Sequence, residues 1–238
     1  MKKKIVFMLG ATAILGAAML DVVNVPVVNE PTVVYADGKS QKEAVEKTKD
    51  YVKYDHASKA NIRKQLIEWD GFSEEDAQYA VNHVKCNYKK AALETAKDYY
   101  KHNHMSKEAI QDQLTSEWDQ FTEKEAQYAV KHLKVDYKKA ALARAKKLYK
   151  SSHLSKQAIY NALFSPDLRF TEEEAQYAVD NLKVDYKEAA LAEAKELQEI
   201  DLEYGEETDL NFLYSGLTSS PYYFTEEEAQ YAIDNLNK

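Results

Sequence analysis

The sequence predicts an all-α fold: four tandem three-helix repeats of about 49 residues that follow an N-terminal signal segment. Three observations support this class. Glycine (6) and proline (4) are scarce for 238 residues, as in helical proteins with few sharp turns. One tetrapeptide recurs along the chain, and helix start signals recur in register with it. The 45% hydrophobic and 30% charged composition is that of a folded chain.

Residues 1–36 are expected to be a signal peptide or an N-terminal anchor. Three lysines follow the initial methionine, and residues 5–20 are apolar. As a helix, these sixteen residues would span roughly 24 Å, less than the roughly 30 Å hydrocarbon core, which favours a signal over a permanent span. Val34 and Ala36 fit cleavage before Asp37. Cleavage and retention as an anchor both stay open.

The tetrapeptide Ala-Gln-Tyr-Ala marks the repeat. It begins at Ala77, Ala126, Ala175 and Ala229, at spacings of 49, 49 and 54 residues. The predicted units are residues 41–88, 89–137, 138–186 and, in divergent form, 187–238. Three helices in so short a unit make a core that is marginal alone, so the units are expected to stack in tandem.

Capping patterns predict where the helices of each unit begin. The third helices start at capping boxes, Thr122 with Glu125, Thr171 with Glu174 and Thr225 with Glu228, and at a weaker version, Ser73 with Asp76. The second helices start at Ser58, Ser106, Ser155 and Asp209. Apolar stripes such as Ala91, Leu93, Ala96 and Tyr100 predict the first helices. Linkers such as 134–137 lack glycine and proline, so each third helix is expected to run almost directly into the next first helix.

The strings LSKQAIY (residues 154–160) and FTEEEAQYA (residues 170–178), with residues 105–117, resemble the Ltp repeat of host cell-surface-exposed lipoproteins. The resemblance covers residues 41–238. It implies a tandem helix-turn-helix fold displayed outside the cytoplasmic membrane of Gram-positive bacteria. In prophage-encoded members it implies superinfection exclusion, by interference with the tape measure protein of an incoming phage so that DNA release is blocked.

The chain departs from the family's name because its only cysteine, Cys86, cannot be a lipidated cysteine that follows a signal. Secretion and retention at the cell surface are both compatible with this. A lone cysteine on a helix is usually a small buried side chain, and we expect that role for Cys86.

The first candidate protein-binding residues are Tyr79, Tyr128, Tyr177 and Tyr231 of the repeated tetrapeptide. On the third helix of unit 2 the core stripe contains Ala126, Ala129 and Val130, which leaves Tyr128 on nearly the opposite side. Two interpretations stay open. The tyrosines form a binding ladder, or they pack against the first helix of the same or the next unit.

The second candidates are Glu203, Glu206 and Glu207, in an acidic insertion of the fourth unit. Without residues 1–36 the chain has 29 basic and 38 acidic side chains, a net charge of −9, and residues 187–238 contribute 3 and 13 of them. This insertion would attract a basic partner segment, and a simple solvated surface stays open as the alternative.

No catalytic or phosphate-binding motif appears, so the chain is expected not to be an enzyme and to bind no cofactor. His56, His104 and His153 recur one unit apart and do not converge on a metal, which favours a loop role near a helix end. His83 and His132, replaced by asparagine in units 3 and 4, indicate polar helix-end contacts. Export and acidic charge oppose nucleic-acid binding, and membrane contact is expected only through the N-terminal segment.

The sequence therefore predicts an exported or cell-surface binding protein whose partner is another protein. By resemblance, that partner is the phage tape measure protein and the function is superinfection exclusion. The alternative is a host surface protein that binds a cell-wall polymer or another exported protein, with no phage role.

Overall fold

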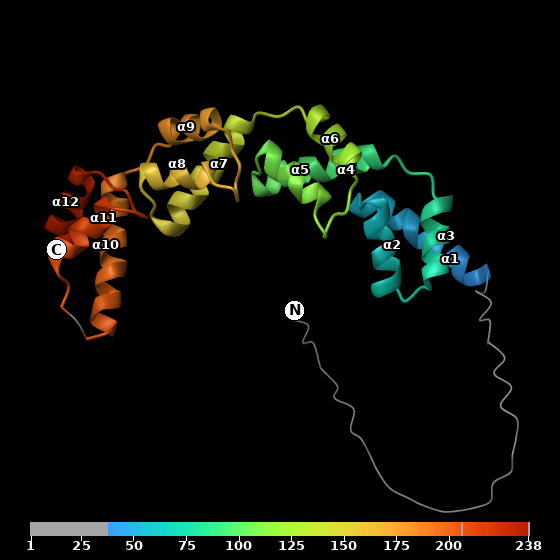
Figure 1. The fold of residues 1–238 in the computed structure, drawn as a ribbon, viewed down its shortest axis with the longest axis horizontal. Helices are drawn as coiled ribbons and strands as arrows, with labels where there is room; N and C mark the ends of the chain where they lie inside the picture. The colour runs from blue at the N-terminus through green and yellow to red at the C-terminus, as the bar shows by residue number, and fades with distance from the viewer. Residues whose placement is uncertain (1–37, 206, 238) are drawn as a thin grey trace, which may run out of the picture. The chain divides into compact units, whose positions relative to one another are not determined.

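The structure, a computed structural model, describes residues 38–205 and 207–237, and these contain helices and connections but no strand (Figure 1). The predicted signal segment lies outside the described residues. The helices form four consecutive groups of three, each with its own packed core. The predicted all-α repeat fold is confirmed.

Each unit contains a long first helix followed by two shorter ones. Unit 1 has α1 (Gly38–Asp50) with the π-helical turn η1 (Tyr51–Asp55), α2 (Lys59–Glu68) and α3 (Glu74–His83). Unit 2 has α4 (Tyr88–Asp98) with the π-helical turn η2 (Tyr99–Asn103), α5 (Lys107–Thr115) and α6 (Glu123–His132). Unit 3 has α7 (Tyr137–Ser152), α8 (Lys156–Phe164) and α9 (Glu172–Asn181). Unit 4 has α10 (Tyr186–Glu203), α11 (Leu210–Thr218) and α12 (Glu226–Asn235).

Alanine faces let the first and third helices of a unit approach closely. In unit 2, Ala92 of α4 packs in one fully buried cluster with Ala126 and Ala129 of α6, and α4 and α6 pack along their length. The second helix supplies the large side chains, Ile110 and Leu114, which fill the space beside the alanines. The equivalent buried pairs are Ile62 and Leu66, Ile159 and Leu163, and Leu213 and Leu217.

The predicted caps are confirmed. The buried hydroxyls of Ser58, Ser106 and Ser155 accept hydrogen bonds from the backbone amides three residues later, at 3.0 to 3.1 Å. The three threonine–glutamate capping boxes are reciprocal, with both side chains satisfying a backbone amide. In unit 1 the Ser73 hydroxyl also caps its helix by accepting from the Asp76 amide at 3.1 Å, but it donates to the Asp76 carboxylate at 2.8 Å, so the reciprocal box does not form there. Caps of this kind fix each helix start locally.

The three repeated histidines lie at the ends of the first helices, as predicted. His56, His104 and His153 adopt left-handed backbone conformations, with φ of 51°, 53° and 43°. Each one stops its helix and turns the chain toward the serine cap of the second helix two residues later.

The expectation that third helices run almost directly into the next first helices is wrong. α6 ends at His132, and α7 begins only at Tyr137. Between them Leu133 has extended backbone (φ −69°, ψ 104°) and buries its side chain in the unit 2 core. Asp136 then accepts hydrogen bonds from the amides two and three residues later and starts α7 as its N-cap. A buried leucine and an aspartate cap therefore break the helix without glycine or proline.

Cys86 lies in the connection between α3 and α4, half-buried, and not on a helix as expected. The equivalent positions of the later connections hold Val135 and Val184, so Cys86 occupies the place of a small apolar side chain. Burial raises the pKa of its thiol above the ordinary value, which lowers its reactivity.

Tyrosines near the ends of two first helices fix the start of the following unit. The Tyr100 hydroxyl donates to the backbone carbonyl of Asp136 at 3.0 Å, and the Tyr149 hydroxyl donates to that of Asp185 at 2.8 Å. In unit 4 the same position is Gln198, whose amide donates to the Asn237 side chain. The same position in unit 1 is Val52, so among the described residues the joining tyrosine belongs to units 2 and 3.

Candidate protein-binding surfaces

The tyrosine row lies against the first helix of the same unit. The contacts are Lys89 over Tyr128, Lys138 over Tyr177 and Lys187 over Tyr231, with the ammonium nitrogen 5.7, 5.7 and 5.9 Å from the ring centroid. These rings are half-buried, whereas Tyr79 of unit 1 is 39% exposed and has Gln41 in place of the lysine. The contacts in units 2 to 4 support the packing interpretation, and Tyr79 has the most accessible ring of the row.

Each tyrosine also takes part in a polar contact at the end of its helix. The backbone carbonyls of Tyr79 and Tyr128 lie 2.8 Å from Nδ1 of His83 and His132, and those rings stack with centroids 3.7 and 3.9 Å apart. In units 3 and 4 an asparagine amide donates to the tyrosine carbonyl at the same distance, 2.8 Å. The predicted helix-end role of the histidine and asparagine positions is confirmed.

Ion pairs surround the tyrosines of units 3 and 4. Lys138 pairs with Glu173 and Lys187 pairs with Glu227, both at 2.6 Å. The hydrogen bond that the Lys138 ammonium donates to Glu173 raises the pKa of Lys138 above its usual value. In unit 2 the glutamate position holds Lys124, so this pair cannot form there. Because all these groups are exposed, the pairs orient the lysines more than they stabilise the fold.

Three buried tyrosine hydroxyls form a repeated feature that the sequence did not single out. Tyr88, Tyr137 and Tyr186 begin the first helices of units 2, 3 and 4, and among the described residues their hydroxyls have no hydrogen-bond partner. Burial raises the pKa of each to about 12. The three rings contribute apolar packing at the first turn of units 2, 3 and 4, and their hydroxyls do not add to the stability of the fold.

Two of the acidic candidates lie at or after the end of α10. Glu203 is the last residue of α10, Glu207 is exposed a few residues later, and Glu206 lies outside the described residues. In the part of the chain that the structure describes, no ion pair involves Glu203 or Glu207. Their charge is therefore available to a partner.

Sequence reasoning missed two sets of exposed large apolar side chains, one in separate turns and one around the acidic connection. Trp69 and Trp118 lie in the turns between the second and third helices of units 1 and 2 and are 74% and 75% exposed. The other set surrounds the acidic connection, where Ile200, Leu202, Tyr204, Leu210 and Phe212 are between 43% and 79% exposed. The lengthened spacing of unit 4 was the only sequence signal for the second set.

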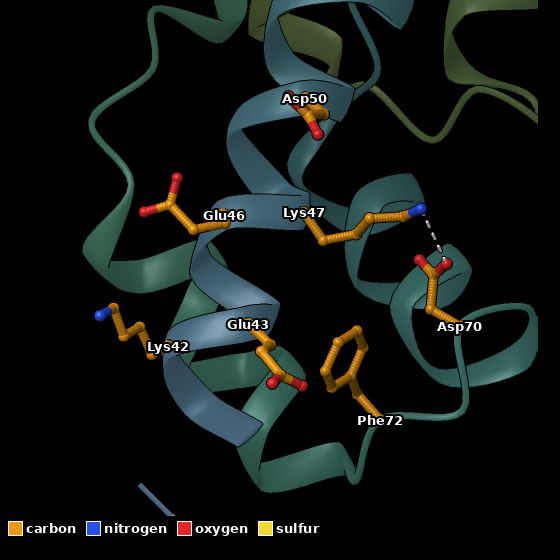
Figure 2. A pocket seen from close by; sticks show the side chains of 7 residues that line it. All are labelled: Lys42, Glu43, Glu46, Lys47, Asp50, Asp70 and Phe72. Carbon is orange, nitrogen blue, oxygen red and sulfur yellow. Dashed lines mark ion pairs between the residues drawn. The ribbon is translucent and has the colours of Figure 1, made fainter. Parts of the chain in front are cut away.

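Unit 1 has a hollow of about 610 Å³ beside α1 (Figure 2). Its lining residues are Lys42, Glu43, Glu46, Lys47, Asp50, Asp70 and Phe72. Figure 2 shows Lys47 extending from α1 to Asp70, at 3.3 Å, with Phe72 beside them. Phe72 is only partly buried, whereas its equivalents in the other units are buried, and unit 1 has Ser40 and Glu43 where the later first helices have a tyrosine and an alanine. The mixed charges of the lining favour no single ligand.

Among the described residues, no three histidine, cysteine, aspartate or glutamate side chains are grouped closely enough to hold a metal ion. None of the helices in the described ranges combines the length and the apolar character needed to cross a bilayer.

The fold defines the chain as a tandem three-helix repeat protein. The model of the family described as host cell surface-exposed lipoprotein matches residues 39–84, 87–133 and 136–182. Because these matches cover more than half of the chain, the chain belongs to this family. The matched residues end before unit 4.

A solved structure is similar to part of the chain. It is described as the structure of Ltp, a superinfection exclusion protein from the Streptococcus thermophilus temperate phage TP-J34. The identity is 45%, over 40% of this chain and 97% of that chain, with a TM-score of 0.39. No curated protein matches this chain.

Proposed function

We propose that this chain is a cell-surface binding protein that confers phage superinfection exclusion. The observation that carries the proposal is the family match of three consecutive repeats, which covers units 1 to 3. The solved relative is described as a superinfection exclusion protein, and the proposal extends that role to this chain. In this proposal the partner is the tape measure protein of an incoming phage, and binding it blocks DNA entry.

Charge supports a protein partner over a polymer. The chain has a net charge of −8, and −9 without the first 36 residues. Nucleic acids and anionic wall polymers carry like charge, so electrostatics oppose their capture by this surface. A protein segment with basic residues is attracted instead.

In this proposal the chain acts by binding and does no chemistry. Glu125, Glu174 and Glu228 are engaged as capping residues, and Glu173 and Glu227 pair with lysines. Each of these acids thus has a local structural partner.

The test is to express the chain in a phage-sensitive Gram-positive host and to measure adsorption and DNA entry separately. The expected result is unchanged adsorption with reduced DNA entry. A variant that lacks residues 1–36 is the matched control, because it keeps the repeats but loses the predicted export signal, and it should not protect. Unchanged DNA entry across several unrelated phages would overturn the proposal.

A further inference from the structure

The connection between α10 and α11 departs from the other units in length and backbone. In unit 3 the first helix stops at Ser152, and His153 turns the chain in a left-handed conformation. In unit 4 the helix continues to Glu203 and the turn comes at Gly205, with φ of 76°. Glycine adopts this conformation without strain. The change lengthens the tetrapeptide spacing from 49 to 54 residues.

On both sides of this connection, apolar side chains stand where unit 3 has polar or small ones. Ile200 stands at the position of Ser151, and it is half exposed (49%). Phe212 stands at the position of Ala158, which is buried in unit 3, yet Phe212 is 79% exposed. Exposed aromatic rings at one place mark a contact surface more often than an isolated one does.

Acidic side chains flank these apolar ones. Ile200 and Tyr204 are four residues apart, and so are Glu199 and Glu203, so near the end of α10 an apolar row lies beside an acidic row. At the position of Glu199, unit 3 has Lys150. No ion pair among the described residues neutralises Glu199, Glu203 or Glu207.

We infer that residues 199–205 and 207–212, the acidic–apolar surface, dock a basic amphipathic segment of a protein partner. The exposed Tyr204 and Phe212 supply the apolar contact, and the acidic row pairs with lysines or arginines at its edge. An anionic membrane surface would be repelled by the same row. This inference rests on the proposed function only in that the chain binds a protein, not in that the protein comes from a phage.

The first test titrates the purified protein with a synthetic leucine–lysine peptide of about 18 residues, five helical turns, that has one apolar and one basic face. An analogue with glutamine in place of lysine tests the apolar face alone, and an oligolysine peptide tests the basic charge alone. We expect the amphipathic peptide to bind at least about tenfold more tightly than either control, and more weakly as salt shortens the Debye length. Equal binding of the three peptides would overturn the inference.

Point variants locate the site. Changing Glu199, Glu203 and Glu207 to glutamine should weaken binding about tenfold and remove most of its salt dependence. Tyr204→Ser with Phe212→Ser should weaken it about as much, and all of these side chains are exposed, so folding should be unchanged. Trp118→Ser is the matched control, because it removes an equally exposed aromatic ring elsewhere (75%). If Trp118→Ser weakens binding as much as the Tyr204 and Phe212 changes do, the surface is not specific and the inference is wrong.

A chimera tests the connection as a whole. Replacing residues 199–208 with residues 150–154 of unit 3 restores the 49-residue spacing and keeps both the α10 core and the Asp209 cap. We expect the chimera to melt cooperatively and to lose peptide binding. Retained binding in the chimera or in both sets of point variants overturns the inference, so the result does not depend on the chimera folding.

Other occupants give different outcomes. Two results would contradict the inference. One is binding to anionic or zwitterionic vesicles that is the same for the wild type and the glutamine variant. The other is a dimer of the protein that the serine variant dissociates. The infection assay separates it from the proposed function. If the protein binds the peptide but does not protect the host, the docking surface is supported and phage exclusion is refuted. If the chimera still protects the host, phage exclusion is supported and does not depend on this surface.

Discussion

Tyr128→Ala is the substitution that best separates packing from binding in the tyrosine row. The half-buried ring stacks on His132, with centroids 3.9 Å apart, and lies under the ammonium of Lys89 at 5.7 Å. Tyr79 has the same histidine stack, at 3.7 Å, but Gln41 replaces the lysine. Tyr79→Ala is therefore a matched control that lacks one of the two contacts.

The magnitudes follow from those contacts. A stacked ring pair contributes about 0.5–1.5 kcal/mol, and a cation over a partly exposed ring adds about 0.5–1 kcal/mol. Tyr128→Ala should therefore lower the free energy of unfolding by about 1–2.5 kcal/mol, and Tyr79→Ala by about 0.5–1.5 kcal/mol. For a chain of this size that corresponds to a Tm lower by roughly 2–10 °C in the first case. Lys89→Gln, which places the residue of unit 1 in unit 2, should lower the free energy of unfolding by most of the difference between Tyr128→Ala and Tyr79→Ala.

The assay is thermal melting followed by circular dichroism, together with partner or peptide binding. Packing predicts a lower Tm and unchanged binding once the variant is folded. An unchanged Tm for Tyr128→Ala with weakened binding would refute the packing argument and make the tyrosine row an interface.

Three other substitutions test local features. Tyr137→Phe removes a buried hydroxyl without a partner among the described residues, so urea unfolding at pH 7 should show unchanged stability or a gain of up to about 1 kcal/mol. The pKa of Tyr137 is raised to about 12 from 10.0, so the contribution of its protonated hydroxyl to the free energy of unfolding is complete below pH 10 and is lost as the pH rises toward 12. Between these pH values Tyr137→Phe should lose less stability than the wild type. An identical loss in both proteins would contradict this explanation. Ser106→Ala removes the acceptor for the Ala109 amide at 3.1 Å and should cost about 1 kcal/mol in the same assay; a cost near zero would mean that the cap is dispensable. Cys86→Val should leave stability within about 0.5 kcal/mol, and the wild-type thiol should react with iodoacetamide more slowly than free cysteine at pH 7, since burial raises its pKa; faster reaction would show that the thiol is accessible.

The elements that sequence predicted well are the ones determined by neighbouring residues. Ser106 and Thr122 start their helices through hydrogen bonds to amides three residues away, so the pattern is visible in a short window. The same holds for Ile110 and Leu114, whose spacing places both on one helix face. Order and type of the helices could therefore be deduced without knowing how the units pack.

The elements that sequence missed depend on residues far apart in the chain or on unusual caps. Asp136 breaks the helix as a cap, but no glutamate three residues later completes a capping box, so the linker resembled continuous helix. Lys89 meets Tyr128 only because α4 and α6 pack together, 39 residues apart. The hollow of unit 1 is lined by Lys47 of α1 together with Asp70 and Phe72, which follow α2, so its residues come together only once the helices pack.

Unit 4 shows which part of the repeat is free to specialise. The family model ends its matches at residue 182, yet α10, α11 and α12 form the same core, with Ala190, Leu213 and Leu217 buried as in the other units. The residues that depart from the repeat are those of the connection between α10 and α11, where exposed apolar and acidic side chains replace polar and basic ones. Selection for a new contact would keep the core and alter the connection, because changes in the connection leave the packing of the core intact. Drift alone has no reason to place several large apolar side chains in solvent at one connection. The divergent unit is therefore where we expect this chain to differ from its relatives in partner choice.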